Sequence, residues 1–366
     1  MKKVLLFLMA ICCAGMVSAE AYLSDGALVQ LGESYMEENI IRAGDVPELK
    51  EGTMTYDPVN HILTLANVLI ESSTTSTLCF TLSCIHMAEG SQQMEVRVIG
   101  QNIVRATKNN TLGALVLGGG DYVITGLNGT LKLMTDAGIG LGAGCENLTI
   151  KDGVYVYAGY SETGMQTRIG LMPVFSDPVV NIDCATLACF GTEYCMSYVN
   201  PTLNDADLNN LEVSAGYQYN SSKNTWVDGS NNVLKGKTLT FEPTKHIFWL
   251  LNASPEGGTI TVTKKGSPIS SPYRYGKDEE NEEVDIEAIP NEGWEFGGWR
   301  CVNGYTEKGQ AKDKYTLPEL SQSGMLIGYF RKTDAAKPTK PWYLLSEYYE
   351  KIVSFDDWSE SPTVVT

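Results

Sequence analysis

The sequence predicts an all-β protein, in which a solenoid of short strands is followed by a small β-rich module and a short tail. Pairs of apolar residues separated by one residue recur along more than a third of the 366-residue chain, each followed by a bend and a second pair. This alternation is the period of a half-buried strand, and its repetition is typical of a solenoid. Tight-turn residues separate the pairs, as in Asn128-Gly129 and Asp152-Gly153. Apolar residues at helical spacing are nearly absent before the tail.

Six leading apolar pairs carry the repeat: Leu63/Leu65, Val96/Val98, Leu131/Leu133, Leu148/Ile150, Val180/Ile182 and Leu211/Val213. Leu63 and Val96 are 33 residues apart, whereas Leu131 and Leu148 are 17 apart, and the other steps are near twice the shorter one. A strand pair cannot bury its apolar face alone, so it must stack on the next coil. We therefore expect one column inside the solenoid, formed by Leu63, Val96, Leu131, Leu148 and Val180.

Residues 1–19 have the pattern of a secretory signal peptide. Lys2 and Lys3 precede an apolar run, Val4–Cys13, that is too short to span a bilayer, and Val17-Ser18-Ala19 is a small-residue cleavage site. A retained membrane anchor and a lipoprotein start within that run are the alternatives. No later segment is long and apolar enough to cross a membrane. The sequence thus predicts a protein that is secreted or held in the cell envelope, in the periplasm or at the cell surface.

Composition divides the remaining chain into three parts. Residues 20–241 form the predicted solenoid domain, and a strand-like stretch within Tyr22–Met54 is expected to cap its first coil. Residues 246–332 alternate again and contain an aromatic cluster, in which Trp299 is expected to be a core residue. Residues 333–366 contain a Lys-Pro linker and an apolar stripe at helical spacing. This tail is predicted to form a short helix that packs on its own chain or docks on a partner.

The chain carries a net charge of −17, which opposes binding to nucleic acid or to an anionic lipid surface. Such acidity would suit calcium if carboxylates converged, although no cofactor is otherwise implied. The nine cysteines show no zinc-binding spacing, and we expect buried small hydrophobes rather than a disulfide framework, because a domain of this size does not need disulfides. The oligomeric state does not follow from the sequence.

Several phrases in the first part resemble one known family. Gly52–Pro58, Leu63–Asn67, Val98–Asn102, Gly129–Leu133 and Leu148–Gly153 are similar to successive coils of secreted bacterial right-handed β-helix proteins. That family is distantly related to the pectate-lyase solenoids and is often labelled carbohydrate-binding. The resemblance covers residues 22–219 and implies a right-handed parallel β-helix. These phrases describe strands and turns, so they indicate the fold more than an activity.

The second module resembles the bacterial surface repeat named after internalin B. The matching phrases are Ala253–Gly258, Ala288–Gly293 and Phe296–Trp299, within residues 246–332. The resemblance implies a small β-grasp-like fold, in which the Phe and the Trp fill the core, and a spacer or adhesion role without an active site. The composition agrees, because the two glycines between the aromatic residues allow their close approach.

The catalytic motifs of β-helix enzymes are incomplete. Asn181-Ile182-Asp183 resembles the first short motif of the polygalacturonases, but the paired aspartates that should follow one coil later are missing. A calcium-dependent lyase would need converging carboxylates and a basic residue. The outward candidates are scattered over adjacent coils: Lys132, Asp136, Lys151, Asp152 and Asp183. No catalytic residue is assigned, and a pectin-type lyase or hydrolase is the third choice.

Tyrosines are dense in the second half of the solenoid. Val154 and Val156 alternate with Tyr155 and Tyr157, so the valines and the rings face opposite sides of a strand. If the valines fill the core, the rings form an exposed stripe that binds a ligand or packs against the second domain. The candidate ligand-binding residues are Tyr155, Tyr157, Tyr160, Tyr217 and Tyr219.

These observations predict an exported, non-enzymatic binding protein whose partner is a glycan or another cell-surface component. A glycan is the first choice, because a tyrosine ring offers stacking area and a hydroxyl to the apolar face and polar rim of a sugar. The alternative is an adhesion or scaffold protein, in which the β-helix is only a rod and a protein partner meets the tail or the aromatic module.

Overall fold

The computed structural model describes most of the chain between residues 22 and 333. The described residues are 22–25, 27–31, 34–36, 38–72, 78–88, 92–107, 113–161, 166–174, 178–197, 211–276, 284–302, 314–317 and 323–333. The predicted signal peptide and the helix predicted for the tail lie outside the described residues.

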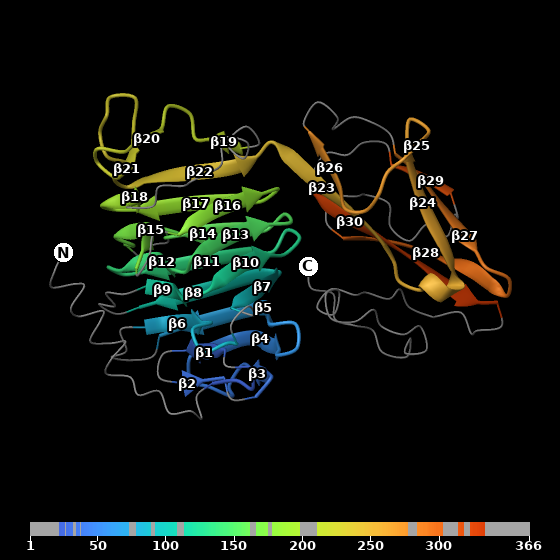
Figure 1. Cartoon of the computed structure of the whole chain (residues 1–366), viewed down its shortest axis with the longest axis horizontal. Coiled ribbons are helices and arrows are strands. Elements are labelled where there is room, and N and C mark those ends of the chain that lie inside the picture. The colour runs from blue at the N-terminus through green and yellow to red at the C-terminus, as the bar shows by residue number, and fades with distance from the viewer. Residues whose placement is uncertain are drawn as a thin grey trace.

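The first part is a β-solenoid of about four turns, whose turns each add a strand to three parallel ladders (Figure 1). The first ladder contains β5 (Ile62–Glu71), β7 (Gln93–Ile99), β10 (Asp121–Thr125), β13 (Asn147–Lys151) and β16 (Val179–Asp183). The second contains β5, β8 (Gln101–Ala106), β11 (Thr130–Thr135), β14 (Tyr155–Ala158) and β17 (Thr186–Gly191). The third contains β6 (Leu78–Ser83), β9 (Gly113–Gly118), β12 (Ile139–Gly144), β15 (Ile169–Pro173) and β18 (Tyr194–Met196). The first two ladders form one sheet, because β5 is long enough to pair with both β7 and β8.

The predicted single column of leading residues is wrong in its register. Leu63 lies beside Val96, and Leu148 lies beside Val180, but these pairs occupy two different columns of the first ladder. Leu131 belongs to the second ladder, where it lies beside Val156. All five leading residues are nevertheless buried in one core. Each coil carries two apolar pairs on either side of a turn, so the 17-residue step joins the second strand of one coil to the first strand of the next.

The turns between the first and second ladders stack on one another and set the register. Asn67, Gly100, Asp152 and Cys184 occupy these turns with φ between +51° and +67°. A Cβ at Gly100 would lie 2.0 Å from the side-chain oxygen of Asn67, so only glycine fits there. The fully buried Asn102 accepts a hydrogen bond from the backbone N–H of Val68 at 3.0 Å and donates to the carbonyl of Ile99 at 3.0 Å. This side chain therefore satisfies backbone groups that the turns leave unpaired.

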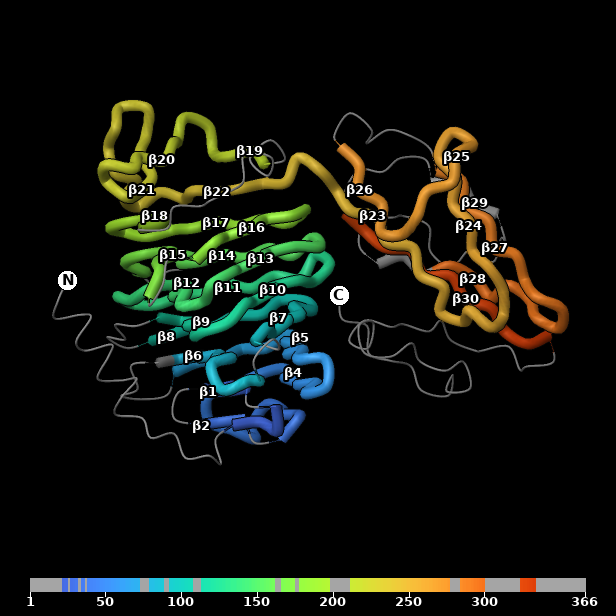
Figure 2. The backbone as a smooth tube through the Cα atoms, viewed as in Figure 1, coloured from blue at the N-terminus to red at the C-terminus, as the bar shows by residue number. Residues whose placement is uncertain are grey.

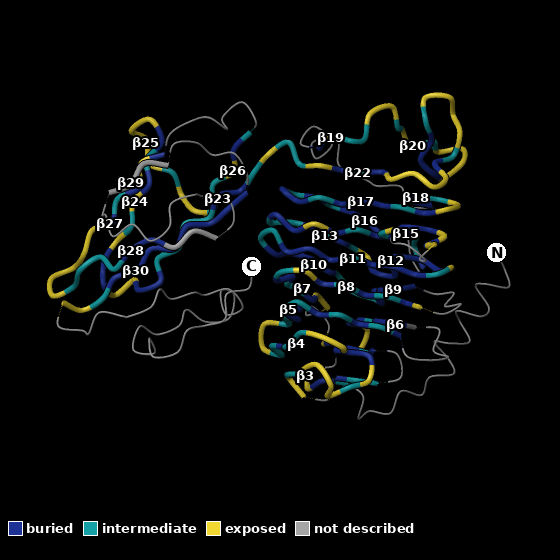
Figure 3. The backbone as a smooth tube through the Cα atoms, turned by 180° about the vertical axis from the view of Figure 1, so that it is seen from behind, coloured by how far each residue is buried: buried dark blue, intermediate teal, exposed yellow. Residues whose placement is uncertain are grey.

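Antiparallel strands pair with the solenoid at both of its ends and so cover part of its open sheet edges. At the N-terminal end, β1 (Leu28–Leu31) and β2 (Ser34–Tyr35) extend the third ladder, and β4 (Leu49–Asp57) with β3 (Ile40–Arg42) pairs with β5. This arrangement confirms the predicted cap. At the other end, β22 (Lys237–Pro243) pairs with β17 and β19 (Leu211–Val213), below the hairpin of β20 (Gln218–Asn220) and β21 (Thr225–Val227) (Figure 2). In Figure 3 the strands between the caps are mostly buried, and exposed segments gather at the two ends.

The module that follows contains two four-stranded sheets. The first has the order β26 (Tyr273–Gly276), β23 (Lys245–Asn252), β30 (Gly324–Lys332) and β28 (Trp294–Val302). The second has the order β25 (Ser267–Pro268), β24 (Gly258–Lys264), β27 (Val284–Pro290) and β29 (Lys314–Leu317). Within the described residues the module has one 3-10 turn, Pro255–Gly257, and no α-helix. The β-grasp-like module predicted from the sequence is therefore built mainly from these two sheets.

Large aromatic side chains form the core of the module. Trp299 is 3% exposed and packs with Phe248, Tyr275 and Phe330, which confirms its prediction as a core residue. The ring of Phe296 lies 4.6 Å from that of Trp299. A β-bulge falls between these two aromatic residues, and a Cβ at Gly297 would lie 1.9 Å from the ring of Tyr329. Glycine at position 297 therefore leaves room for the Tyr329 ring. Phe296 and Trp299 approach each other closely, as the sequence predicted.

Candidate ligand-binding groove

An open groove of about 420 Å³ lies where the second ladder of the solenoid meets the module. Its walls come from β14, β17 and β22 of the solenoid, from β23 of the module and from Ser323, which directly precedes β30. Two of the five candidate tyrosines, Tyr155 and Tyr157, line it. The two hollows near the N-terminal end of the solenoid contain none of the predicted ligand-binding residues, so we take this groove as the candidate site.

Strand alternation places these tyrosines in the groove. Val154 and Val156 are fully buried in the core, whereas Tyr155 is 37% exposed and Tyr157 is half-buried. The alternation predicted from the sequence is therefore present. On the neighbouring strand, β17, Thr186 lies beside Tyr155 and the small Ala188 lies beside Tyr157. Because these neighbours are small, the rings stand above the surface of β17 and form one wall of the groove.

Tyr160 extends this aromatic wall without lining the groove itself. Its ring centroid lies 5.6 Å from that of Tyr157, in an edge-to-face arrangement. The ammonium of Lys132, on β11, lies 4.5 Å from the centre of the Tyr160 ring, within the range of a cation–π interaction. Three of the predicted tyrosines thus form one cluster on the outer face of the second ladder.

The other two predicted residues, Tyr217 and Tyr219, lie in the C-terminal cap. Both are partly buried and pack against the solenoid core. The Tyr219 ring lies 6.1 Å from that of Trp226, and the ammonium of Lys237 lies 5.9 Å from the Tyr217 ring. The structure therefore divides the candidate tyrosines into a groove cluster (Tyr155, Tyr157 and Tyr160) and a cap pair (Tyr217 and Tyr219).

The two groove phenols lie in an environment that keeps them protonated. Burial, followed by the negative charge of Glu242, raises the pKa of Tyr155. The pKa of Tyr157 is raised by burial, by Tyr155 and Tyr160, and by Glu242. At neutral pH both hydroxyls can therefore donate and accept hydrogen bonds, as sugar hydroxyls require.

The module contacts the stacked turns between the first and second ladders. Arg274 of β26 forms an ion pair of 2.8 Å with Asp183, at the end of β16. The side-chain amide of Asn128 donates to the carbonyl of Ser323 at 3.3 Å. Leu127 packs against a small apolar cluster of the module that includes Met325 and Ile327. The tyrosine stripe therefore faces the second domain across the groove, and the binding of a ligand by these rings stays a prediction.

Four of the five outward residues considered for catalysis have local partners. Asp183 pairs with Arg274, Lys151 lies 3.5 Å from Asp152, and the ammonium of Lys132 lies over the Tyr160 ring. Among the residues that the structure describes, no group of three or more His, Cys, Asp or Glu side chains could hold a metal ion.

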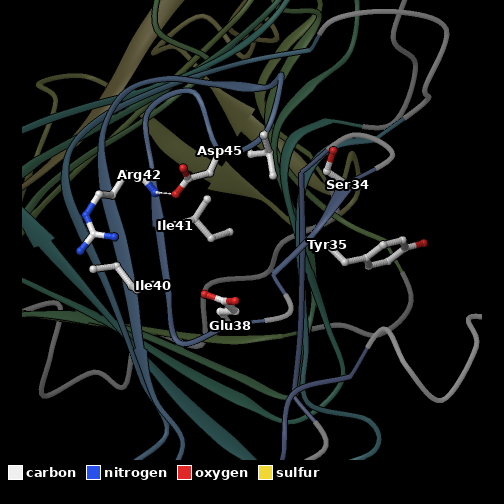
Figure 4. A pocket seen from close by; sticks show the side chains of 8 residues that line it. Ser34, Tyr35, Glu38, Ile40, Ile41, Arg42 and Asp45 are labelled. Atoms are coloured by element: carbon white, nitrogen blue, oxygen red, sulfur yellow. Dashed lines mark hydrogen bonds between the residues drawn. The ribbon is translucent and has the colours of Figure 1, made fainter.

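Two further hollows lie near the N-terminal end of the solenoid, and neither was predicted. One surrounds the turn after β3, where the Asp45 carboxylate accepts a hydrogen bond from the backbone N–H of Arg42 at 2.6 Å (Figure 4). This acid therefore stabilises its own turn. The other lies over β4, β5 and β7 and is lined by polar residues, among them Glu95 and Arg97, which pair at 2.5 Å. No motif or spacing in the sequence marks either hollow.

The described cysteine side chains are structural. Six of them are buried and form no disulfide: Cys79, Cys84, Cys145, Cys184, Cys189 and Cys195. This confirms the expectation of small buried hydrophobes. Burial raises the pKa of Cys79 to about 12, so its thiol is protonated and unreactive at neutral pH.

Comparison with known proteins identifies the module. Residues 250–323 match the divergent InlB B-repeat domain, in agreement with the predicted resemblance of residues 246–332. Comparison with curated proteins and with solved structures found no significant match. These comparisons do not confirm the predicted resemblance of residues 22–219 to the pectate-lyase-like family, although the predicted β-solenoid is present. None of the helices in the described part of the chain is long and apolar enough to cross a membrane. A bacterial surface-repeat domain next to a β-solenoid fits an extracellular or surface binding role.

Proposed function

We propose that the protein is exported, and that it binds a glycan in the groove between the solenoid and the module. The observation that carries this proposal is the juxtaposition of Tyr155 and Tyr157 with the small residues of β17, which leaves the faces of two rings beside an open groove. Such rings stack on the apolar face of a sugar. The hydroxyls of Thr186 and Thr240, which also line the groove, add hydrogen-bonding groups for the rim of the sugar.

The location of the groove supports the proposal further. A ligand held there would contact side chains of both domains, because His246 and Ser323 of the module face the tyrosine wall. The ion pair between Arg274 and Asp183 holds the module beside the groove. Pockets at the junction of two domains are common ligand sites.

A glycan array, with and without calcium, tests the proposal directly. The full-length protein is expected to bind at least one glycan class. The double substitution Tyr155→Ser and Tyr157→Ser should weaken that binding about fivefold or more, since about 0.5–1.5 kcal/mol of aromatic contact is lost for each ring. The double change to Phe should retain the stacking and lose only the contribution of the hydroxyls.

A matched control is Tyr194→Ser, which removes a half-buried tyrosine from β18 in the third ladder, outside the groove. This variant should bind as the parent does. Unchanged binding by the Tyr155/Tyr157 serine variant would contradict the proposal. Failure to bind any glycan would leave the adhesion or scaffold alternative, and degradation of polygalacturonate by the purified protein would favour the lyase or hydrolase alternative.

A further inference from the structure

Glu242 determines the charge of the groove. It lies on β22 and lines the groove together with Tyr155 and Tyr157. Its negative charge contributes to the raised pKa of both tyrosines, which places it within electrostatic range of both hydroxyls. On the adjacent strand β19, Glu212 lies directly opposite Glu242 in the antiparallel register. A second carboxylate therefore lies on the strand next to Glu242.

Two cations near the tyrosines are not paired with Glu242. Arg274 is engaged with Asp183 at 2.8 Å, so that pair is neutral. Lys132 lies directly beside Tyr157 on the neighbouring strand β11, and it is separated from β22 by three strand spacings in the order β11, β14, β17, β22. Three strands span roughly 14 Å, which exceeds the Debye length of about 8 Å at physiological ionic strength. The net charge of −17 on the whole chain adds a long-range repulsion for anions.

We infer that the groove accepts neutral and amino-bearing sugars and rejects uronates, with Glu242 as the residue that determines this selectivity. The inference rests on the proposed glycan-binding function. The carboxylate accepts a hydrogen bond from a sugar hydroxyl or pairs with a sugar ammonium, and it repels a sugar carboxylate beside it. A pectin-like acidic chain is then the poorest ligand for this groove.

Three hexasaccharides test the inference by isothermal titration of the full-length protein at about pH 6, where a sugar amine is protonated. The probes are the hexamers of glucosamine, N-acetylglucosamine and galacturonate. The glucosamine hexamer should bind the parent most tightly and the galacturonate hexamer most weakly. Glu242→Gln should reduce the preference for glucosamine over galacturonate about tenfold, with affinity for the neutral hexamer changed less than twofold.

The matched control is Glu212→Gln, which removes the same charge from the opposite strand but from a side chain outside the groove. It should change the preference less than threefold. Equal effects of the two substitutions would overturn the role of Glu242, as would tight galacturonate binding by the parent. If glycans bind but Glu242→Gln leaves the preference unchanged, only this inference fails. If none of the three hexamers binds the parent while the array also shows no ligand, the proposed function fails and the inference fails with it.

Discussion

The solenoid and the module bury their apolar side chains in different ways. The solenoid core consists mainly of Leu, Val and Ile, and each side chain stacks on its counterpart in the next coil. The module core is smaller and centres on aromatic side chains, among them Phe248, Trp299 and Phe330. The stability of the solenoid is therefore a sum of many similar contacts between neighbouring coils. The stability of the module depends on a few large side chains.

The two domains also set their register by different means. In the solenoid, left-handed turn residues such as Asn67 and Gly100 repeat at equivalent places, and each coil aligns the next. In the module, the bulge between Phe296 and Gly298 aligns β28 with β30. A repeated feature is visible as a period in a sequence, whereas a unique one is not.

The largest expected effect is that of a charge in a stacked column. Leu148 is fully buried between Tyr122 and Val180 on the adjacent strands. Leu148→Asp should destabilise the solenoid by several kcal/mol, because an unpaired buried carboxylate is poorly solvated. Calorimetry should show loss of the solenoid transition and retention of the module transition. Thr149→Asp, at the partly exposed neighbouring position, should cost about 1 kcal/mol or less. Equal costs for both variants would contradict the stacked core.

A somewhat smaller effect is expected for the central aromatic residue of the module. Trp299→Ala should destabilise the module by about 3–5 kcal/mol, since it leaves a large cavity among aromatic side chains. The solenoid transition should remain where it is in the parent. Ile289→Ala changes a residue that is 48% exposed and serves as the control, with an expected effect within about 0.5 kcal/mol. An unchanged melting temperature of the module in Trp299→Ala would show that the core is assigned wrongly.

Alkaline pH should separate the two domains by their thiols, with an effect that is small for each thiol within one pH unit. Burial raises the pKa of Cys79, Cys145 and Cys195 from 9.0 to about 12, and that of Cys84 to about 11. The folded pKa is higher than the unfolded one, so this stabilisation is complete below pH 9 and is lost as the pH rises towards 12. Each thiol should lower the unfolding free energy of the solenoid by about 1.4 kcal/mol per pH unit in that range.

Urea denaturation in reducing buffer at several pH values would measure this slope. Cys79→Ala should reduce it by the contribution of one thiol, after its pH-independent cavity cost is subtracted. The module should show a smaller dependence, because its sequence contains a single cysteine, Cys301. A solenoid slope that Cys79→Ala leaves unchanged would contradict the assignment of this thiol.

Several features of the site were predictable because they depend on neighbours in the sequence. The alternation of Val154 and Val156 with Tyr155 and Tyr157 follows from the two-residue period of a strand. The separation of Tyr217 and Tyr219 from this group was not predictable, because the hairpin that carries them belongs to the cap rather than to a coil. The prediction that Leu131 stacks in one column with the other leading residues was wrong for a related reason. Both strands of a coil have the same apolar pattern, and only the tertiary pairing shows which ladder each strand joins.

Local patterns in the sequence are enough to predict the class of fold, the order of the two domains, the family resemblance of the module and the outward direction of the groove tyrosines. These features follow from local periodicity and short motifs, which the chain carries within a few residues. Only the tertiary structure decided that Glu242 and His246 lie near Tyr155, and that Arg274 meets Asp183. These residues are separated by about ninety positions in the chain. They come together because the solenoid stacks coil upon coil before its last strand leads into the module.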